Sequence, residues 1–476
     1  GWVDRGKHSS QGLTGALQWQ FLPRWQLQLS HAEGRRKPMR YFGVPLIDGK
    51  PLEALRRTNY NVQDARITFR DHWSELTLQG SPSDNVAVRS RLYHIRSNRL
   101  WFDAENYTWD AARQQIRLAG DTAIRHHQKQ TGNTTDVTFD SKLLGMDNTI
   151  SAGFDLNHSS LQHDNNTYSG NPRYVSLLSP ETGFFDSDLP FIPRYRNTAD
   201  QYALFVEDRL AVTGQLSLVA GLRHDRVRIR RDDLITGSRA FSRTWNSTGH
   251  RLGAVYALTP TLSVYAQHSR AADPSTAPLM MSASGAKADM TIGRQIEVGI
   301  KQSLPQQRGE WTLAAYNITK HNLQSRDPAN PDNSIQVGKQ SSRGLEGTLS
   351  LALSSTLRLD ADATVLRARY DDFNDAVDGA IVSRSGNTPP DVPERLANLW
   401  LSWQMHPQWT LSGGARHVGK RYANRANDLT LPAYTTADLA LTWRPSDATT
   451  LALHGHNIFN RHYYSTVYYN EKQWFV

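Results

Sequence analysis

The most constraining feature of this sequence is a one-by-one alternation of apolar and polar residues that recurs along almost the whole chain. In the segment 345–353, Leu and Gly at odd positions alternate with Glu, Thr, Ser and Ala at even positions. On a β-strand, successive side chains point to opposite faces, so such a segment has one apolar and one polar face. The connections between these segments alternate between very short turns and long, aromatic-rich loops. This combination predicts an all-β, antiparallel up-and-down transmembrane barrel with lipid outside and water inside.

Composition is compatible with this fold class and argues against several others. No run approaches the ~20 apolar residues of a membrane helix, and the mean hydropathy of the 476 residues is −0.59. A barrel can be this polar because only alternate residues face lipid. The absence of cysteine excludes disulfides and thiolate metal sites. The net charge of +9 is spread along the chain rather than concentrated in a tail, so we do not expect nucleic acid to be a partner.

The alternation predicts about 18 strands in successive two-strand units. The later strand of the first unit begins at Trp25, and the strands at 62–80 and 114–143 are long enough to divide in two. The units are 13–20 with the strand from Trp25, 62–80 with 85–100, 114–143 with 149–163, 197–211 with 216–231, 245–258 with 262–270, 291–303 with 310–326, 338–353 with 357–371, 392–404 with 409–421, and 432–444 with 449–462. The long loops are predicted at 34–60, 101–113, 164–196, 232–244, 271–290, 327–337, 372–391, 422–431 and from 463 onward.

The direction of the strands predicts that the parent barrel has more of them. Short turns of outer-membrane barrels are periplasmic and long loops are extracellular, and complete barrels have an even strand number with both ends in the periplasm. The first predicted strand here runs toward the periplasm and the last runs away from it. An odd number of strands is therefore expected beyond each end, giving roughly 20 or more in all, which argues against a complete porin. Because Gly1 is preceded by neither a start methionine nor a signal peptide, we expect a processed piece or a fragment.

Tryptophans support this orientation. Aromatic rings concentrate where headgroups meet hydrocarbon. Five tryptophans flank the short turns, namely Trp19, Trp25, Trp403, Trp409 and Trp443. Ordinary aromatic packing on strands is the alternative explanation.

Six motifs, in consistent order along the chain, resemble those of TonB-dependent outer-membrane receptors, in particular the ferric-siderophore group. The most specific is Asn457-Ile458-Phe459-Asn460 followed by Tyr463-Tyr464, which is similar to the N-L-F-D-x-x-Y-Y stretch of the penultimate strand. The others are 201–208 (QYALFVED), 221–225 (GLRHD), 293–301 (GRQIEVGIK), 343–347 (RGLEG), and Gly386-Asn387 with Pro393.

The resemblance implies a barrel of about 22 strands, with a separate N-terminal plug domain in its lumen. Residues 1–476 would be a partial barrel domain. The plug, the TonB-contacting box and the last strand are expected to lie outside this chain, which ends at Trp474-Phe475-Val476 in the predicted last outer loop. Both edges of such a piece would be unpaired.

No set of residues in the sequence predicts an enzyme or a resident metal. His126 and His127 are adjacent and would point to opposite faces of a strand, whereas His454 and His456 would share the wet face. Asp360 and Asp362 would also share that face, as the charges that line barrel interiors do. The sequence contains no phosphate-binding glycine loop, nucleophile elbow or HExxH motif. We therefore expect no cofactor, with iron present only as part of a transported chelate.

Ligand recognition is expected in the outer loops. The segment 35–60 contains seven Lys and Arg residues against two acids, and large aromatics crowd the two loops that follow. Aromatic rings beside arginines suit a bulky, often anionic iron chelate. The candidate ligand-binding residues are Arg40, Tyr41, Phe42, Trp101, Tyr107, Tyr168, Tyr174, Phe184 and Phe185. The alternatives are that loop cations bind lipopolysaccharide phosphates and that loop aromatics pack on one another.

The leading hypothesis is a monomeric outer-membrane receptor that imports a ferric siderophore into the periplasm, energised by the TonB complex. Its other expected partners are membrane lipid and lipopolysaccharide. A passive porin or channel for anionic or sugar solutes is the principal alternative, and an outer-membrane enzyme or adhesin is a third. Within the receptor family, cobalamin, haem and oligosaccharide receptors share the architecture, so the sequence leaves the ligand open.

Overall fold

The computed structural model describes residues 3–166, 172–273, 278–326, 334–377, 380–468 and 473–476. Among these residues, no helix is long and apolar enough to cross a membrane. The strands are β1 (Ser9–Leu22), β2 (Trp25–Lys37), β3 (Val44–Pro45), β4 (Arg66–Ser83), β5 (Val86–Asp110), β6 (Gln115–Leu143), β7 (Met146–Asn165), β8 (Arg173–Val175), β9 (Ile192–Ala211), β10 (Leu216–Asp233), β11 (Arg239–Thr259), β12 (Leu262–Asp273), β13 (Thr291–Leu304), β14 (Gly309–Arg326), β15 (Ser334–Ala352), β16 (Leu357–Asp372), β17 (Asn374–Val377), β18 (Ala380–Ser383), β19 (Arg395–His406), β20 (Trp409–Val418), β21 (Arg421–Tyr422), β22 (Thr430–Leu431), β23 (Tyr434–Ser446), β24 (Thr449–Gly455), β25 (Thr466–Val467) and β26 (Gln473–Phe475). Short 3-10 turns are η1 (Glu53–Leu55), η2 (Pro278–Met280), η3 (Gly285–Lys287) and η4 (Pro305–Gln307).

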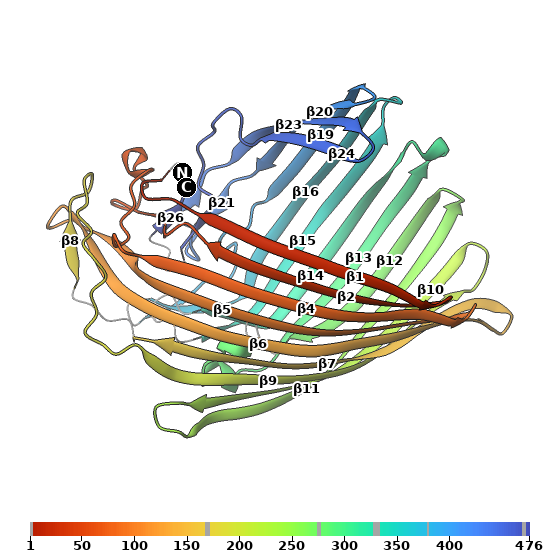
Figure 1. Cartoon of the computed structure of the whole chain (residues 1–476), viewed down its shortest axis with the longest axis horizontal. Helices are drawn as coiled ribbons and strands as arrows, with labels where there is room; N and C mark the ends of the chain where they lie inside the picture. The colour runs from red at the N-terminus through yellow and green to blue at the C-terminus, as the bar shows by residue number, and fades with distance from the viewer. Residues whose placement is uncertain (1–2, 167–171, 274–277, 327–333, 378–379, 469–472) are drawn as a thin grey trace.

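Most of the strands form one strongly curved antiparallel sheet of nineteen strands (Figure 1). Of these, β8 pairs with the first residues of β6. The other eighteen form a meander in chain order that skips the short loop strands. Within the described part of the chain, β1 pairs with β2 and β24 with β23, and no pairing joins β1 to β24. The up-and-down barrel wall predicted from the alternation is therefore confirmed.

The predicted strand boundaries differ from the structure mainly at the loop end. The predicted loop 101–113 is wrong, because β5 and β6 continue as one hairpin as far as the pair Asp110–Gln115. The predicted end of the last strand at residue 462 is also wrong, since β24 ends at Gly455. Neither β4 nor β6 divides in two. Hydrogen-bonded pairs continue past the apolar band, where lipid no longer imposes the alternation that reveals a strand in the sequence.

The two faces of the sheet differ as the alternation predicted. Leu204, Leu345 and Leu399 are 67%, 55% and 50% exposed and lie on the convex face, where lipid rather than protein would cover them. The opposite face is polar. There, Arg223 contacts Asp155 at 2.6 Å and Asp225 at 3.0 Å. Outward leucines and inward ion pairs are the arrangement of a barrel that separates lipid from a wet lumen.

The tryptophans predicted at the short-turn end lie on the outward face. Trp19 is 60% exposed and Trp403 is 49% exposed, while the Trp409 and Trp443 rings stack on neighbouring strands with centroids 5.4 Å apart. These rings lie at the edge of the apolar band nearest the short turns, as expected of an interfacial aromatic belt.

At the opposite end, the loops pack into a cap that contains both ends of the chain (Figure 1). Strand β3, from the loop after β2, pairs with β26, which pairs with β25. Val3, Tyr41, Val44 and Leu55 form a buried cluster in contact with Phe475. Gly43 has a φ of +88°, and a Cβ there would lie 2.8 Å from the carbonyl oxygen of Trp474, so only glycine allows β3 and β26 to approach this closely.

Gln473 connects three segments of this loop cap. It is fully buried; its Nε2 donates to the carbonyl oxygens of Phe42 (2.8 Å) and Glu105 (3.0 Å), and its Oε1 accepts from the backbone N–H of Tyr107 at 3.1 Å. The side chain thereby satisfies buried backbone groups on the loop after β2 and on β5.

Replacing Gln473 with Ala is expected to loosen the cap, because each buried polar group left unpaired costs about 1–3 kcal/mol. Limited proteolysis of the protein in detergent measures this as faster cleavage within 38–60. The control is Lys50→Ala, which changes an exposed side chain of the same cap. Equal cleavage rates for Gln473→Ala and the unmodified protein would show that Gln473 does not hold the cap.

Candidate ligand-binding site

An uninterrupted row of aromatic rings crosses the concave face of the sheet just below the loop cap. We call it the luminal ladder, and it consists of Phe69 on β4, Trp101 on β5, His126 on β6, His163 on β7 and Tyr195 on β9. Neighbouring ring centroids are 5.2, 5.1, 5.0 and 4.7 Å apart in that order. Register explains the row, because His126 lies opposite His163 and His163 opposite Tyr195. His126 Nε2 and His163 Nδ1 are also hydrogen-bonded at 2.8 Å.

Arginines lie at both ends of the ladder. The guanidinium carbon of Arg231 on β10 is 3.7 Å from the Tyr195 ring centroid, and Arg231 Nε donates to Asn197 Oδ1 at 2.9 Å. At the other end, the guanidinium carbons of Arg99 and Arg36 lie 5.3 and 5.9 Å from the Phe69 centroid. Each contact is within the range of a cation–π interaction. The ladder is therefore a continuous band of polarisable rings with positive charge at its two ends.

One loop folds inward beside the ladder. Met281 and Ala286, from the segment between β12 and β13, pack against Val227, Ile229 and Trp245 of the concave wall. The carbonyl oxygen of Met281 accepts a hydrogen bond from Asn197 Nδ2 at 3.2 Å, and that of Ala286 accepts one from Arg243 Nη1 at 2.8 Å. This loop borders the ladder at its Tyr195 end.

Four of the predicted ligand-binding residues belong to the cap. Tyr41 and Tyr107 are buried, and Phe42 is half-buried against Tyr468, with ring centroids 5.6 Å apart. Arg40 Nη1 donates to the carbonyl oxygen of Ala65 at 3.0 Å. Burial raises the pKa of Tyr41 well above its ordinary value, so the hydroxyl stays neutral. These contacts are those of loop packing, the alternative noted for the loop aromatics.

The remaining predicted residues are divided between the ladder and the cap surface. Trp101 belongs to the ladder, so its placement in a loop was wrong, as was that of Tyr107, which also lies on β5. Tyr174 is on β8 beneath Arg113, with 4.5 Å between ring centroid and guanidinium carbon. Phe184 is 65% exposed, and Phe185 packs on Phe102 at 5.2 Å. Tyr168 lies outside the described residues. No contact tests ligand binding by any of these nine residues, which stays a prediction.

Sequence reasoning missed most of the ladder. Phe69, Arg99 and Arg231 were not among the predicted site residues, and His126 was considered only with its neighbour His127. The prediction that those two histidines diverge is confirmed, since His126 contacts His163 and His127 Nδ1 lies 2.7 Å from Asn98 Oδ1. The sequence held only a partial signal for the ladder. Each ladder residue lies toward the loop end of its strand, but the sequence does not show which of these residues are neighbours.

The other residues considered for chemistry lie in ordinary polar contacts. Asp360 accepts hydrogen bonds from Ser350 and Arg358, and Asp362 from Asn398. The His454 and His456 rings are 6.3 Å apart. The interpretation of these residues as wet-face side chains is consistent with these contacts.

Comparison with known proteins supports the fold. Residues 40–458 match the family model described as TonB dependent receptor-like, beta-barrel. The metal-pseudopaline receptor CntO of Pseudomonas aeruginosa is 26% identical over 450 residues, which cover 90% of this chain and 59% of that receptor. The ferrioxamine receptor of Yersinia enterocolitica is 28% identical over 276 residues, 56% of this chain and 37% of that receptor. The chain thus spans less than two thirds of the length of these relatives.

Two solved structures of siderophore receptors have a similar fold. The receptor PiuA from Acinetobacter baumannii has a TM-score of 0.88 at 18% identity, covering 99% of this chain and 73% of that chain. BauA, the ferric preacinetobactin receptor of the same organism, has a TM-score of 0.81 at 17% identity, covering 97% of this chain and 70% of that chain. Both are described as receptors. The outward apolar band and the receptor family that matches assign this chain to the outer membrane. The chain belongs to the TonB-dependent receptor β-barrel family.

Proposed function

We infer that this protein is the barrel of a receptor that captures a ferric siderophore at the cell surface and imports it into the periplasm with energy from the TonB complex. The observation that carries this inference is the luminal ladder, with its arginines at both ends. The names of the relatives support the same substrate class. This proposal includes a plug domain and a contact with TonB, both of which would be features of the whole receptor.

The ladder fits a ferric chelate better than a small hydrophilic solute. Siderophores surround iron with hydroxamate, catecholate or carboxylate oxygens, so their complexes are bulky and often anionic. Aromatic rings provide contact area at little cost in side-chain entropy, and arginine donates forked, charge-assisted hydrogen bonds to such oxygens. A passive porin, the alternative, would work best with an open lumen, whereas here a loop folds inward beside the ladder.

Binding of ferric chelates to the protein in detergent tests this function. Quenching of tryptophan fluorescence by a panel of ferric hydroxamates, catecholates and carboxylates is expected to reveal saturable binding of at least one anionic complex. Arg231→Gln is expected to weaken that binding about tenfold, because a charge-assisted hydrogen bond contributes about 1.5 kcal/mol or more. Arg358→Gln, on the same face but distant from the ladder, is the control. If no ferric chelate in the panel saturates the protein, the siderophore assignment is wrong.

Lipopolysaccharide is a second proposed partner, for which the outward face supplies the argument. Directly beyond the apolar band, Arg343 on β15 lies opposite Arg367 on β16. In the same way, Arg270 on β12 lies opposite Arg294 on β13. Like charges directly opposite on neighbouring strands are destabilising unless an anion lies between them. Lipid headgroup phosphates on the extracellular side would supply that anion.

The double variant Arg343→Gln/Arg367→Gln is expected to retain several-fold less lipopolysaccharide through purification than the unmodified protein. Quantifying bound phosphate and lipid per protein measures this, with Arg358→Gln as a control for loss of charge on the opposite face. Equal amounts of lipid on all three proteins would show that the paired arginines do not bind headgroups.

A further inference from the structure

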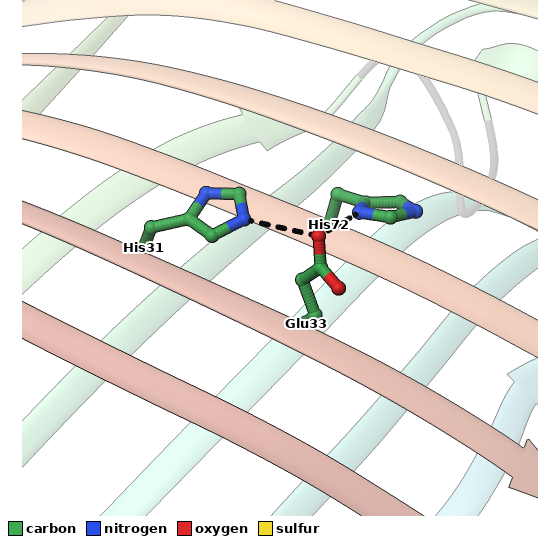
Figure 2. A group of neighbouring side chains, drawn as sticks. All are labelled: His31, Glu33 and His72. Atoms are coloured by element: carbon green, nitrogen blue, oxygen red, sulfur yellow. Dashed lines mark hydrogen bonds and ion pairs between the residues drawn. The ribbon is translucent and has the colours of Figure 1, made fainter.

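A histidine–carboxylate cluster lies on the outward face of the barrel, away from the luminal ladder (Figure 2). His31 and Glu33 are two residues apart on β2 and share a face, and the register places His72 of β4 opposite Glu33. Their positions continue the outward row of Leu27 and Leu29 beyond the apolar band. The side chains are about half-exposed, at 50%, 54% and 43% for His31, Glu33 and His72, so all three are accessible from outside the barrel.

The distances suit a metal ion. Glu33 Oε1 lies 3.5 Å from His31 Nε2 and 3.3 Å from His72 Nδ1, and the possible ligand atoms of the three residues all lie within 4.8 Å of one another. Two ligands bound to Zn²⁺ at about 2.0–2.1 Å in a tetrahedral arrangement are about 3.3 Å apart. Both contacts of Glu33 therefore already match this spacing, and side-chain rotation alone can bring the two histidines closer.

A neighbouring hydroxyl orients one of the histidines. His31 Nδ1 is 2.8 Å from Ser74 Oγ on β4. When Nδ1 carries the proton and donates to Ser74, Nε2 has a free lone pair, and this is the nitrogen that faces Glu33 (Figure 2). Metal-binding histidines commonly donate their second ring N–H to such a partner, which fixes the tautomer and the ring plane.

We propose that His31, Glu33 and His72 bind a divalent transition-metal ion, with Zn²⁺ the best match. Two imidazole nitrogens and one carboxylate favour Zn²⁺, Ni²⁺ or Cu²⁺ over Ca²⁺ and Mg²⁺, which prefer oxygen ligands. Three protein ligands leave one tetrahedral position for water or an anionic oxygen. Within the part of the chain that the structure describes, the ligand atoms of these three side chains are close enough together to share one ion. The site is independent of the ferric siderophore proposed as cargo.

Titration calorimetry tests the site on the chelator-treated protein in detergent. At pH 7.5 we expect one Zn²⁺ to bind per chain, with affinity at least tenfold weaker in His72→Ala and in Glu33→Gln. The matched control is His94→Ala. His94 is an exposed histidine on the next strand, β5, and its Nδ1 lies 2.8 Å from Thr131 Oγ1. His94→Ala is expected to bind Zn²⁺ as the unmodified protein does.

Cobalt provides a readout of the ligands themselves. Co²⁺ in place of Zn²⁺ is expected to give the visible absorption of a four-coordinate complex, which disappears in His72→Ala. If the unmodified protein binds neither ion, or if His94→Ala weakens Zn²⁺ binding as much as His72→Ala does, there is no metal site here and the cluster is a set of His–Glu ion pairs.

Discussion

Replacing both Trp101 and Tyr195 with Ala is expected to weaken ferric-chelate binding at least 30-fold. These rings stand at the second and last positions of the luminal ladder, and Tyr195 also lies under the Arg231 guanidinium. A central aromatic contact at a binding surface contributes about 2 kcal/mol, and 1.4 kcal/mol corresponds to tenfold in affinity. The dissociation constant of the protein in detergent, measured with the chelate that the binding panel identifies, checks this prediction.

Trp403→Ala is the matched control for the ladder variant. It also removes a large aromatic ring from a strand, but that ring lies on the outward face and is 49% exposed. Its expected effect on chelate affinity is nil. If the ladder variant and Trp403→Ala bind the chelate equally well, the ladder is not the ligand-binding surface.

Leu399→Arg is expected to lower the stability of the membrane-inserted barrel by about 2–4 kcal/mol, the cost of arginine near the bilayer midplane on the lipid face of a barrel. Leu399 is the middle outward residue of β19, between Trp403 at one interface and Arg395 at the other. Urea unfolding in lipid vesicles, and the amount of folded barrel recovered from outer membranes, measure the loss.

The control for this substitution is one residue away. Asn398 lies on the opposite face of β19, and its Nδ2 donates to Asp362 Oδ2 at 2.8 Å. Asn398→Arg therefore places the same charge in the wet lumen beside a carboxylate, and its expected cost is small. Equal destabilisation by the two substitutions would contradict the assignment of the two faces.

The strands could be predicted from the sequence because lipid and water impose opposite demands on alternate residues. Outside the region that faces lipid, the predicted strand boundaries were less accurate. Beyond the apolar band, the polar and aromatic residues around Trp101 and Tyr107 no longer alternate, and a regular hairpin was interpreted as a loop. The end of β24 was missed because local backbone geometry ends it: Asn457 and Asn460 have φ values of +49°, in the left-handed region that an extended strand does not use.

The candidate site was less predictable because it depends on register. Trp101, His126 and Tyr195 come from three strands, and whether their rings meet is decided by which residues lie opposite one another across the sheet. In the loop cap, the Gln473–Tyr107 hydrogen bond joins residues separated by 366 positions. The sequence correctly indicated that loop aromatics and arginines matter, but residues such as Arg40 and Tyr41 pack in the cap rather than on the ladder.

The central claim is that this barrel imports a ferric siderophore actively. Its most direct test is uptake of radiolabelled iron, supplied as the ferric chelate that binds the protein, by iron-starved cells producing the receptor with and without functional TonB. The account predicts saturable uptake that disappears without TonB and falls in the Trp101→Ala/Tyr195→Ala variant. Uptake that rises in proportion to chelate concentration and does not depend on TonB would contradict the claim and identify a passive channel.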